Sequence, residues 1–243
     1  MVACNQCFRL RSYCLEVART RRKAYRDEIY WGLPVPGFGD PDARILILGL
    51  APAAHGANRT GRVFTGDGVG GSGDFLMSGL HRTGLASIPT SHHAGDGLTL
   101  RGVFVAAAAR CAPPANKPLP GEVENCRVHL AAEVAALPQL RVVVALGKIA
   151  WDAWLAFVGA AAPLPRPRPA FGHGVVAELA APGTSGPAGL TLIGCFHPSR
   201  QNTHTGRVTA PMYDDVFRTA AATASLDAPG VQRRTKQRAL SAR

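Results

Sequence analysis

Apolar runs and helical patterns alternate along most of this chain. Residues 44–50, 103–107 and 141–146 are short apolar runs, which is typical of parallel strands buried on both faces. Apolar side chains at helical spacing follow each run. These stretches predict helices over residues 75–85, 121–137, 148–157 and 211–226, and an amphipathic helix with a basic polar face over residues 8–29. Strands that alternate with helices predict an α/β fold with a mostly parallel sheet covered on both faces.

The carboxyl-terminal half is less regular. Residues 175–179 and 190–195 flank a turn rich in Pro and Gly, which is compatible with an antiparallel pair or with an irregular strand before the last core strand. Residues 228–243 contain five Arg or Lys residues and little that could pack. We therefore predict a single domain over residues 1–227 and a disordered basic tail over residues 228–243.

The net charge of the chain says more about its function than its length does. The 243 residues include 27 Lys and Arg against 16 Asp and Glu, a formal charge of +11, and their 47% hydrophobic content excludes wholesale disorder. The excess of positive charge indicates a polyanionic partner, most often nucleic acid. No apolar run reaches the roughly 18 residues of a membrane span, and the first 26 residues lack the apolar core of a secretory signal. We expect a cytoplasmic protein without a membrane partner.

Cysteines form two pairs with metal-ligand character. Cys4 and Cys7 make a C-x2-C motif, and Cys111 and Cys126 follow much later with 14 residues between them. Four thiolates suit either zinc or an iron–sulfur cluster, and the wide gap between the pairs excludes a self-contained zinc finger. Simple buried thiols remain an alternative for some of them. Cys14 and Cys195 lie in a predicted helix and strand, where core packing is expected.

Loops after the apolar runs carry the candidate chemistry. In open α/β sheets, ligands bind beyond the carboxyl ends of the strands. His197 stands at such an end and begins a polar loop over residues 197–206, although a solvated surface loop would have a similar composition. Residues 66–71 match G-x-G-x-x-G, but a dinucleotide-binding fingerprint must follow its strand directly, and this one does not.

Three motifs and the spacing of the four cysteines resemble those of the family 5 uracil-DNA glycosylases, and the motifs occur in the family's order along the chain. The motifs are GLAPAAHGANRTGRVFTGD (49–67), CAPPANKPLP (111–120) and HPSRQNTHTG (197–206). The resemblance covers most of the chain before the basic tail. It implies a three-layer α/β/α sandwich with the uracil-DNA glycosylase fold, and a monofunctional glycosylase of base excision repair that hydrolyses N-glycosidic bonds in DNA. It also implies substrates beyond uracil, such as hypoxanthine, ethenocytosine and mispaired thymine.

The resemblance also implies roles for individual residues. Phe64 stacks on the flipped base, Asn116 reads its Watson–Crick edge, and His197 donates a hydrogen bond to the leaving uracil. A [4Fe–4S] cluster is implied at Cys4, Cys7, Cys111 and Cys126, and contacts to DNA are implied at Ser199, Arg200, Gln201, Asn202 and His204. From the residues alone, Phe64 could instead be a buried loop anchor and Asn116 a turn residue.

Two alanines separate this chain from the family 1 enzymes. Ala51 stands where their motif has a catalytic Asp, and Ala53 stands where it has a Tyr that blocks the 5-methyl group of thymine. The nearest acidic residue is Asp67, to which we assign water activation or stabilisation of the cationic sugar, although a turn-forming role in Gly-Asp-Gly is an alternative. Ala53 predicts an open base pocket.

Two other classes of protein compete with this interpretation. A non-catalytic DNA-binding protein with a structural metal at the four cysteines would have the same charge and loops. An α/β hydrolase acting on a small molecule lacks support, because the chain has no G-x-S-x-G motif and that activity leaves the charge unexplained. We expect a monomer that binds DNA containing uracil or damaged bases.

Overall fold

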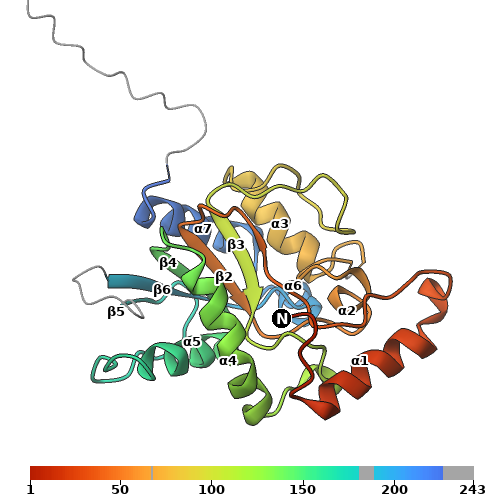
Figure 1. The fold of residues 1–243 in the computed structure, drawn as a ribbon. Coiled ribbons are helices and arrows are strands. Elements are labelled where there is room, and N and C mark those ends of the chain that lie inside the picture. Colours follow the sequence, from red (N-terminus) through yellow and green to blue (C-terminus); the bar gives the residue numbers. More distant parts are fainter. Residues whose placement is uncertain (67, 181–188, 227–243) are drawn as a thin grey trace, which may run out of the picture.

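A six-stranded sheet forms the centre of the molecule (Figure 1). The structure is a computed structural model and describes residues 1–66, 68–180 and 189–226. The strands are β1 (Phe38–Gly39), β2 (Ile45–Gly49), β3 (Val103–Ala107), β4 (Val142–Leu146), β5 (Val176–Ala180) and β6 (Gly189–Cys195), in the spatial order β1-β3-β2-β4-β6-β5. The four inner strands are parallel, and β1 and β5 pair antiparallel at the two edges.

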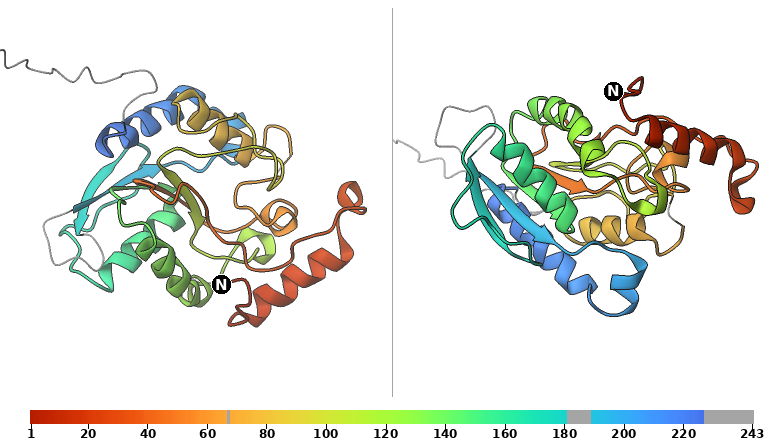
Figure 2. Two further views of the ribbon diagram at one scale, coloured as in Figure 1. Left: turned by 45° about the horizontal axis from the view of Figure 1, so that its top comes forward. Right: turned by 90° about the horizontal axis from the view of Figure 1, so that it is seen from below.

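Helices cover both faces of this sheet. The helical segments are α1 (Phe8–Thr20), η1 (Lys23–Tyr25), α2 (Ala57–Thr60), α3 (Ser72–Arg82), η2 (Pro114–Asn116), α4 (Pro120–Ala135), α5 (Lys148–Gly159), α6 (Arg200–His204) and α7 (Ala210–Thr223). The right-hand view of Figure 2 shows α3 and α7 on one face and α4 and α5 on the other. The predicted three-layer α/β/α sandwich with a mostly parallel sheet is confirmed.

Strand β2 shows why a strand at the centre of this sheet is apolar throughout. Ile45 and Ile47 point into the core beneath α3 and α7, whereas Leu46 and Leu48 point into the core beneath α4 and α5. All four side chains are fully buried. Successive side chains of a strand face opposite sides, so a strand covered on both faces needs apolar residues throughout.

Helices α3 and α7 pack closely over one of these cores. Gly79 of α3 lets the two helices approach, because a β-carbon there would lie 3.1 Å from the ring of Phe217. At the end of α3, the Arg82 guanidinium donates to both carboxylate oxygens of Asp214 on α7, at 2.8–3.0 Å. This pairing fixes the helix that follows the candidate loop at residues 197–206.

The first predicted helix is longer than the helix that forms. The predicted helix over residues 8–29 ends at Thr20, because Arg21 adopts a left-handed conformation with φ +53°. The segment after it packs on the loop that follows β2, where Trp31 N–H donates to the Arg59 carbonyl at 2.9 Å. The two segments around the Pro/Gly-rich turn form the antiparallel pair β5 and β6. Strand β1 and the short helix α6 were not predicted.

Two further expectations concern the chain as a whole. The predicted basic tail, residues 228–243, lies outside the described residues. Among the described helices, none has the length and apolar character needed to cross a membrane.

A buried ion pair joins α4 to the loop after β3. The Arg110 side chain is 1% exposed, and its guanidinium donates to the Glu133 carboxylate at 2.7 and 3.1 Å. Glu133 also accepts the Gly37 N–H at 2.8 Å. The pair therefore ties together three segments that are distant in sequence.

We expect Glu133→Ala to lower the free energy of unfolding by about 3–5 kcal/mol, because it leaves a buried guanidinium without its partner. Glu124 makes a matched control: it pairs with Arg127 on the exposed side of the same helix, and its removal should change the free energy by less than about 1 kcal/mol. Urea titrations followed by circular dichroism measure both values. Equal losses for the two variants would contradict a structural role for the Arg110–Glu133 pair.

Candidate active site

A cavity of about 390 Å³ opens beyond the carboxyl ends of the parallel strands. The loops after β2, β3 and β6 and the first residue of α3 surround it, as expected for a site in an open α/β sheet. The lining residues are Leu50, Ala51, Ala53, Ala57, Val63, Phe64, Ser72, Ala107, Asn116, His197, Ser199 and Arg200. Three motifs that are far apart in sequence thus meet at one hollow.

Most of the residues singled out in the sequence lie at this cavity, and some do not. Those that line it are Ala51, Ala53, Phe64, Asn116, His197, Ser199 and Arg200. Gln201 and His204 lie further along α6 and are exposed. Asp67 lies outside the described residues. The apolar liners Leu50, Ala57, Val63 and Ala107 were not predicted, because buried alanines and valines give no chemical signal in a sequence.

Phe64 is held in a strained conformation over the end of β2. Its backbone is left-handed, with φ +50°, which is uncommon for a bulky residue. The ring rests on Gly49, where a β-carbon would lie 2.7 Å from it. The His197 ring lies nearby, with the two ring centroids 6.1 Å apart. Gly49 is therefore required for this aromatic wall of the cavity.

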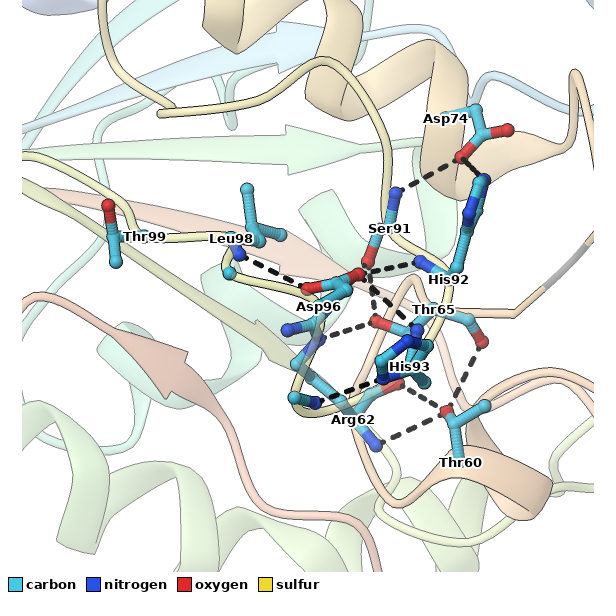
Figure 3. Close-up of polar contacts among 12 residues, drawn as sticks. Thr60, Arg62, Thr65, Asp74, Ser91, His92, His93, Asp96, Leu98 and Thr99 are labelled. Atoms are coloured by element: carbon cyan, nitrogen blue, oxygen red, sulfur yellow. Dashed lines mark hydrogen bonds and ion pairs between the residues drawn. The ribbon is translucent and has the colours of Figure 1, made fainter.

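The loop that carries Phe64 is anchored by the buried side chain of Arg62 (Figure 3). Its Nε donates to Thr65 Oγ1 at 2.9 Å, and its Nη2 donates to Ser91 Oγ at 3.1 Å and Asp96 Oδ2 at 2.7 Å. The hydroxyls of Thr65 and Ser91 also bond to each other at 2.6 Å. Phe64 thus lies between two residues that a single buried network fixes.

Asp96 stays ionised within this network. Burial opposes the charge, but hydrogen bonds from Arg62 and from the backbone N–H groups of His92 and Leu98 outweigh it. Together they hold the pKa of the Asp96 carboxyl well below its usual range. Arg62 and Asp96 lie 34 positions apart with no local pattern between them, so this pair was not predicted.

A second arginine fixes the chain just before residue 67. Arg59 donates from Nη2 to the Gly66 carbonyl at 2.8 Å and from Nε to the His55 carbonyl at 2.9 Å. On the far side of residue 67, a β-carbon at Gly68 would lie 3.6 Å from the Arg200 guanidinium. Gly66, before residue 67, is therefore close to Arg59, and Gly68, after it, is close to Arg200 at the cavity.

Asn116 also has a left-handed backbone. Ala115 and Asn116 have φ values of +52° and +55°. Two consecutive non-glycine residues in this region are costly, and such strain persists only where the surrounding structure imposes it. The Asn116 side chain is exposed at the cavity and bonds to no other described residue. Its amide is available to a ligand as both donor and acceptor.

His197 is electrically neutral at physiological pH. Burial lowers the pKa of its imidazole to about 4, because the charged form would lose its solvation. The loop around it is fixed by Asn202, whose amide donates to the His197 carbonyl at 2.8 Å. Ser199 caps α6 by accepting the Asn202 N–H at 3.3 Å. A neutral imidazole still carries one N–H that can donate to a ligand.

A second and much smaller cavity, of about 10 Å³, lies beside α1. The four cysteines singled out in the sequence all line it: Cys4, Cys7, Cys111 and Cys126. Cys14 and Cys195 are buried in the core instead, as predicted. We refer to these four residues and their hollow as the cysteine cavity.

Three of the four sulfur atoms in the cysteine cavity each accept a hydrogen bond. Asn125 Nδ2 donates to Cys7 Sγ at 3.4 Å, Arg11 Nη1 to Cys111 Sγ at 3.8 Å, and the Arg110 N–H to Cys126 Sγ at 3.4 Å. Such donors stabilise the thiolate form of cysteine and tune iron–sulfur clusters. Burial raises the pKa of the Cys126 thiol to about 11, so a cation must displace its proton.

Two buried nitrogen atoms of the cysteine cavity have no partner. They are Arg110 Nε and His129 Nε2. No three described His, Cys, Asp or Glu side chains are close enough to hold a single metal ion. The unpaired Arg110 Nε–H is a donor that an anionic group bound among the thiols could use.

Comparison with known proteins agrees with this geometry. The model of the uracil-DNA glycosylase superfamily matches residues 36–221, a range that includes all three cavity loops. A type-5 uracil-DNA glycosylase from Mycobacterium tuberculosis is 49% identical over 225 residues, 92% of this chain and 79% of the relative. Type-5 enzymes from Thermus thermophilus and Pyrobaculum aerophilum are 48% and 43% identical, over 93% and 92% of this chain and 96% and 90% of theirs.

These matches cover the strands, the cavity loops and, for the relatives, nearly the whole chain. Both the fold and the position of the cavity are those expected from the motif resemblance. The chain belongs to the uracil-DNA glycosylase superfamily and, within it, to the type-5 uracil-DNA glycosylases.

Proposed function

We propose that this protein removes uracil and several larger damaged bases from DNA by hydrolysing the bond between base and sugar. The observation that carries the proposal is the cavity beyond the strand ends, where an aromatic ring, an exposed amide and a neutral imidazole meet. A base inside a duplex is inaccessible to such groups, so the nucleotide must first be flipped out of the stack. Relatives named type-5 uracil-DNA glycosylases support this activity.

Base recognition falls to Phe64 and Asn116. The Phe64 ring offers a flat apolar surface on which any base can stack. The exposed Asn116 amide supplies one donor face and one acceptor face for the Watson–Crick edge. The left-handed backbone at both residues supports this assignment, because strain of this kind concentrates at functional sites.

His197 stabilises the departing base. As the bond to the sugar breaks, negative charge develops on the base, and a donor fixed in advance lowers the energy of that state. The neutral imidazole donates its N–H to uracil O2. Since the pKa of His197 is about 4, the imidazole that donates is uncharged throughout the physiological range.

The attack of water on the sugar has a different carboxylate to assist it than in the family 1 enzymes. Ala51 brings no carboxylate to the cavity, so we assign assistance to Asp67, which either orients water or stabilises the cationic sugar. A largely dissociative reaction, in which the base leaves before water attacks, makes such a carboxylate helpful rather than indispensable.

The start of α6 is the proposed contact with DNA. Arg200 borders the cavity and Gln201 and His204 are exposed beside it, so these side chains can reach phosphates or the gap that the flipped base leaves. Ser199 caps the helix and presents its N-terminal end. Asn202 is included in the proposed contact through its amide oxygen, while its amide nitrogen donates to the His197 carbonyl.

We further propose that the cysteine cavity holds a [4Fe–4S] cluster through Cys4, Cys7, Cys111 and Cys126. The fit rests on four converging thiols, three donors to their sulfurs and two unpaired buried nitrogens. When bound, the cluster would supply cross-linking rather than redox chemistry. These residues would tie the segment before α1 to α4 and to the loop after β3.

Cys126→Ser should abolish the visible absorption of a brown wild-type protein and lower its iron content, because the variant lacks one of four ligands. Iron and sulfide analysis together with the absorption spectrum measure this. Cys195→Ala is the matched control. Cys195 is also buried, but it lies in β6 and does not line the cysteine cavity, so the iron content should be unchanged. A colourless wild type with stoichiometric zinc would contradict the cluster and favour a structural zinc site.

The activity itself is tested with duplexes that carry uracil, hypoxanthine, ethenocytosine or thymine opposite guanine. We expect base release from uracil and from at least one larger base, detected as alkali-sensitive abasic sites. Ala53→Tyr should suppress excision of the larger bases by about 10- to 200-fold more than that of uracil, because the ring occupies the space that they need.

Ala53→Ser controls for the substitution itself, since it changes the volume little and should keep the wild-type preference. Equal loss of all substrates in Ala53→Tyr would contradict the open pocket while leaving the glycosylase assignment intact. No base release from any duplex would contradict the proposed function and favour a non-catalytic DNA-binding protein.

A further inference from the structure

The backbone on either side of His197 is held by side chains from three other segments. The Phe196 N–H donates to His173 Nδ1 at 3.1 Å, and the Phe196 carbonyl accepts the Tyr213 hydroxyl at 2.8 Å. The His197 carbonyl accepts the Asn202 amide at 2.8 Å. Tyr213 and Asn202 thus fix the peptide groups directly before and after the His197 Cα, and His173 fixes the peptide group that precedes them. Together they set the direction in which the His197 imidazole leaves the chain.

His173 occupies a distinctive place among these anchors, because only one of its protonation states can serve. The Phe196 N–H is a donor, so Nδ1 of His173 must be the acceptor. The proton then resides on Nε2, which donates to the Met212 carbonyl of α7 at 3.3 Å. The His173 and Phe196 rings also pack against each other, with centroids 5.2 Å apart.

We propose that neutral His173 is a positioning residue for base excision, which acts by accepting the Phe196 N–H and so aligning His197 with the flipped base. The inference rests on the proposed function of His197. His173 itself does not line the base cavity; it lies at a separate hollow between β6 and α7, so it acts through the backbone and not by contact with DNA.

Surroundings of His173 favour the required neutral form. Burial lowers the pKa of its imidazole, while the Met212 carbonyl and the Asp215 carboxylate act in the opposite direction. Asp215 forms an ion pair with Arg218, whose Nη1 lies 2.8 Å from Asp215 Oδ1. The Arg207 guanidinium lies over the Phe196 ring. Tyr213 is uncharged, since burial raises the pKa of its hydroxyl. Acidification through the pKa of His173 removes the acceptor and sets an N–H against the Phe196 N–H.

The test compares His173→Ala and His173→Asn by single-turnover excision of uracil between pH 5 and 8. Alanine removes the acceptor, whereas asparagine restores an acceptor close to the Nδ1 position that does not titrate. We expect His173→Ala to be slowed about tenfold, the effect of losing one buried hydrogen bond, with binding to an abasic duplex unchanged. His173→Asn should be near wild type at neutral pH and lack the decline of the wild type on acidification. His81→Asn, on the exposed side of α3, is the control.

Two results would overturn the proposal: a His173→Ala enzyme as fast as wild type at every pH, or a His173→Asn enzyme as slow as His173→Ala with the wild-type pH profile. If His173→Ala fails to fold, the pH profile of His173→Asn still tests the proposal, because a decline on acidification like that of the wild type would contradict it. The ¹⁵N shifts of the His173 ring provide a readout independent of activity. An unprotonated Nδ1 at neutral pH supports the geometry even if no base is released, whereas a protonated Nδ1 refutes it.

Discussion

Complete burial of the central strands determines where this protein can carry chemistry. Strands β2, β3, β4 and β6 are covered on both faces, so a polar side chain within them would lose its solvation. Functional groups are therefore confined to the loops that leave the carboxyl ends of the strands. Because the strands are parallel, the loops after β2, β3 and β6 emerge at the same edge and bring Phe64, Asn116 and His197 to one cavity.

Loops at a sheet edge would not hold these side chains without further support. Two of the three loops are fixed by buried polar contacts: the Arg62 guanidinium network beside Phe64, and the side-chain anchors on the backbone around His197. The Arg62 network holds the chain on both sides of Phe64, whose left-handed backbone an isolated loop would avoid. The strain is tolerated because the surrounding hydrogen bonds are satisfied in this one conformation.

The strands and the main cavity residues were accessible from the sequence because both follow local rules. An apolar run predicts a buried strand, and the polar residue that ends it, such as His197, predicts a site. The end of α1 at Thr20 was not predicted, because the turn at Arg21 has a positive φ that no glycine or proline marks in the sequence. The Arg62–Asp96 pair and the hold of His173 on Phe196 also join residues with no local pattern between them.

Asn202 illustrates the same limit. Its position in a polar motif predicts a contact with DNA, and the structure adds a role that the motif did not indicate, because the amide nitrogen donates to the carbonyl of His197. Composition identifies a loop as functional but does not tell which of its side chains face a ligand and which hold the loop. That distinction depends on the direction of each side chain, which only the packed structure supplies.

The account depends on a flipped base that lies between Phe64 and His197. The most direct measurement is a crystal structure of the protein with a duplex that carries 2′-fluoro-2′-deoxyuridine, whose glycosidic bond resists hydrolysis. We predict uracil stacked on Phe64, its Watson–Crick edge at Asn116 and its O2 within hydrogen-bonding distance of the His197 ring. Uracil that remains stacked in the duplex, or that binds away from this cavity, would contradict the account.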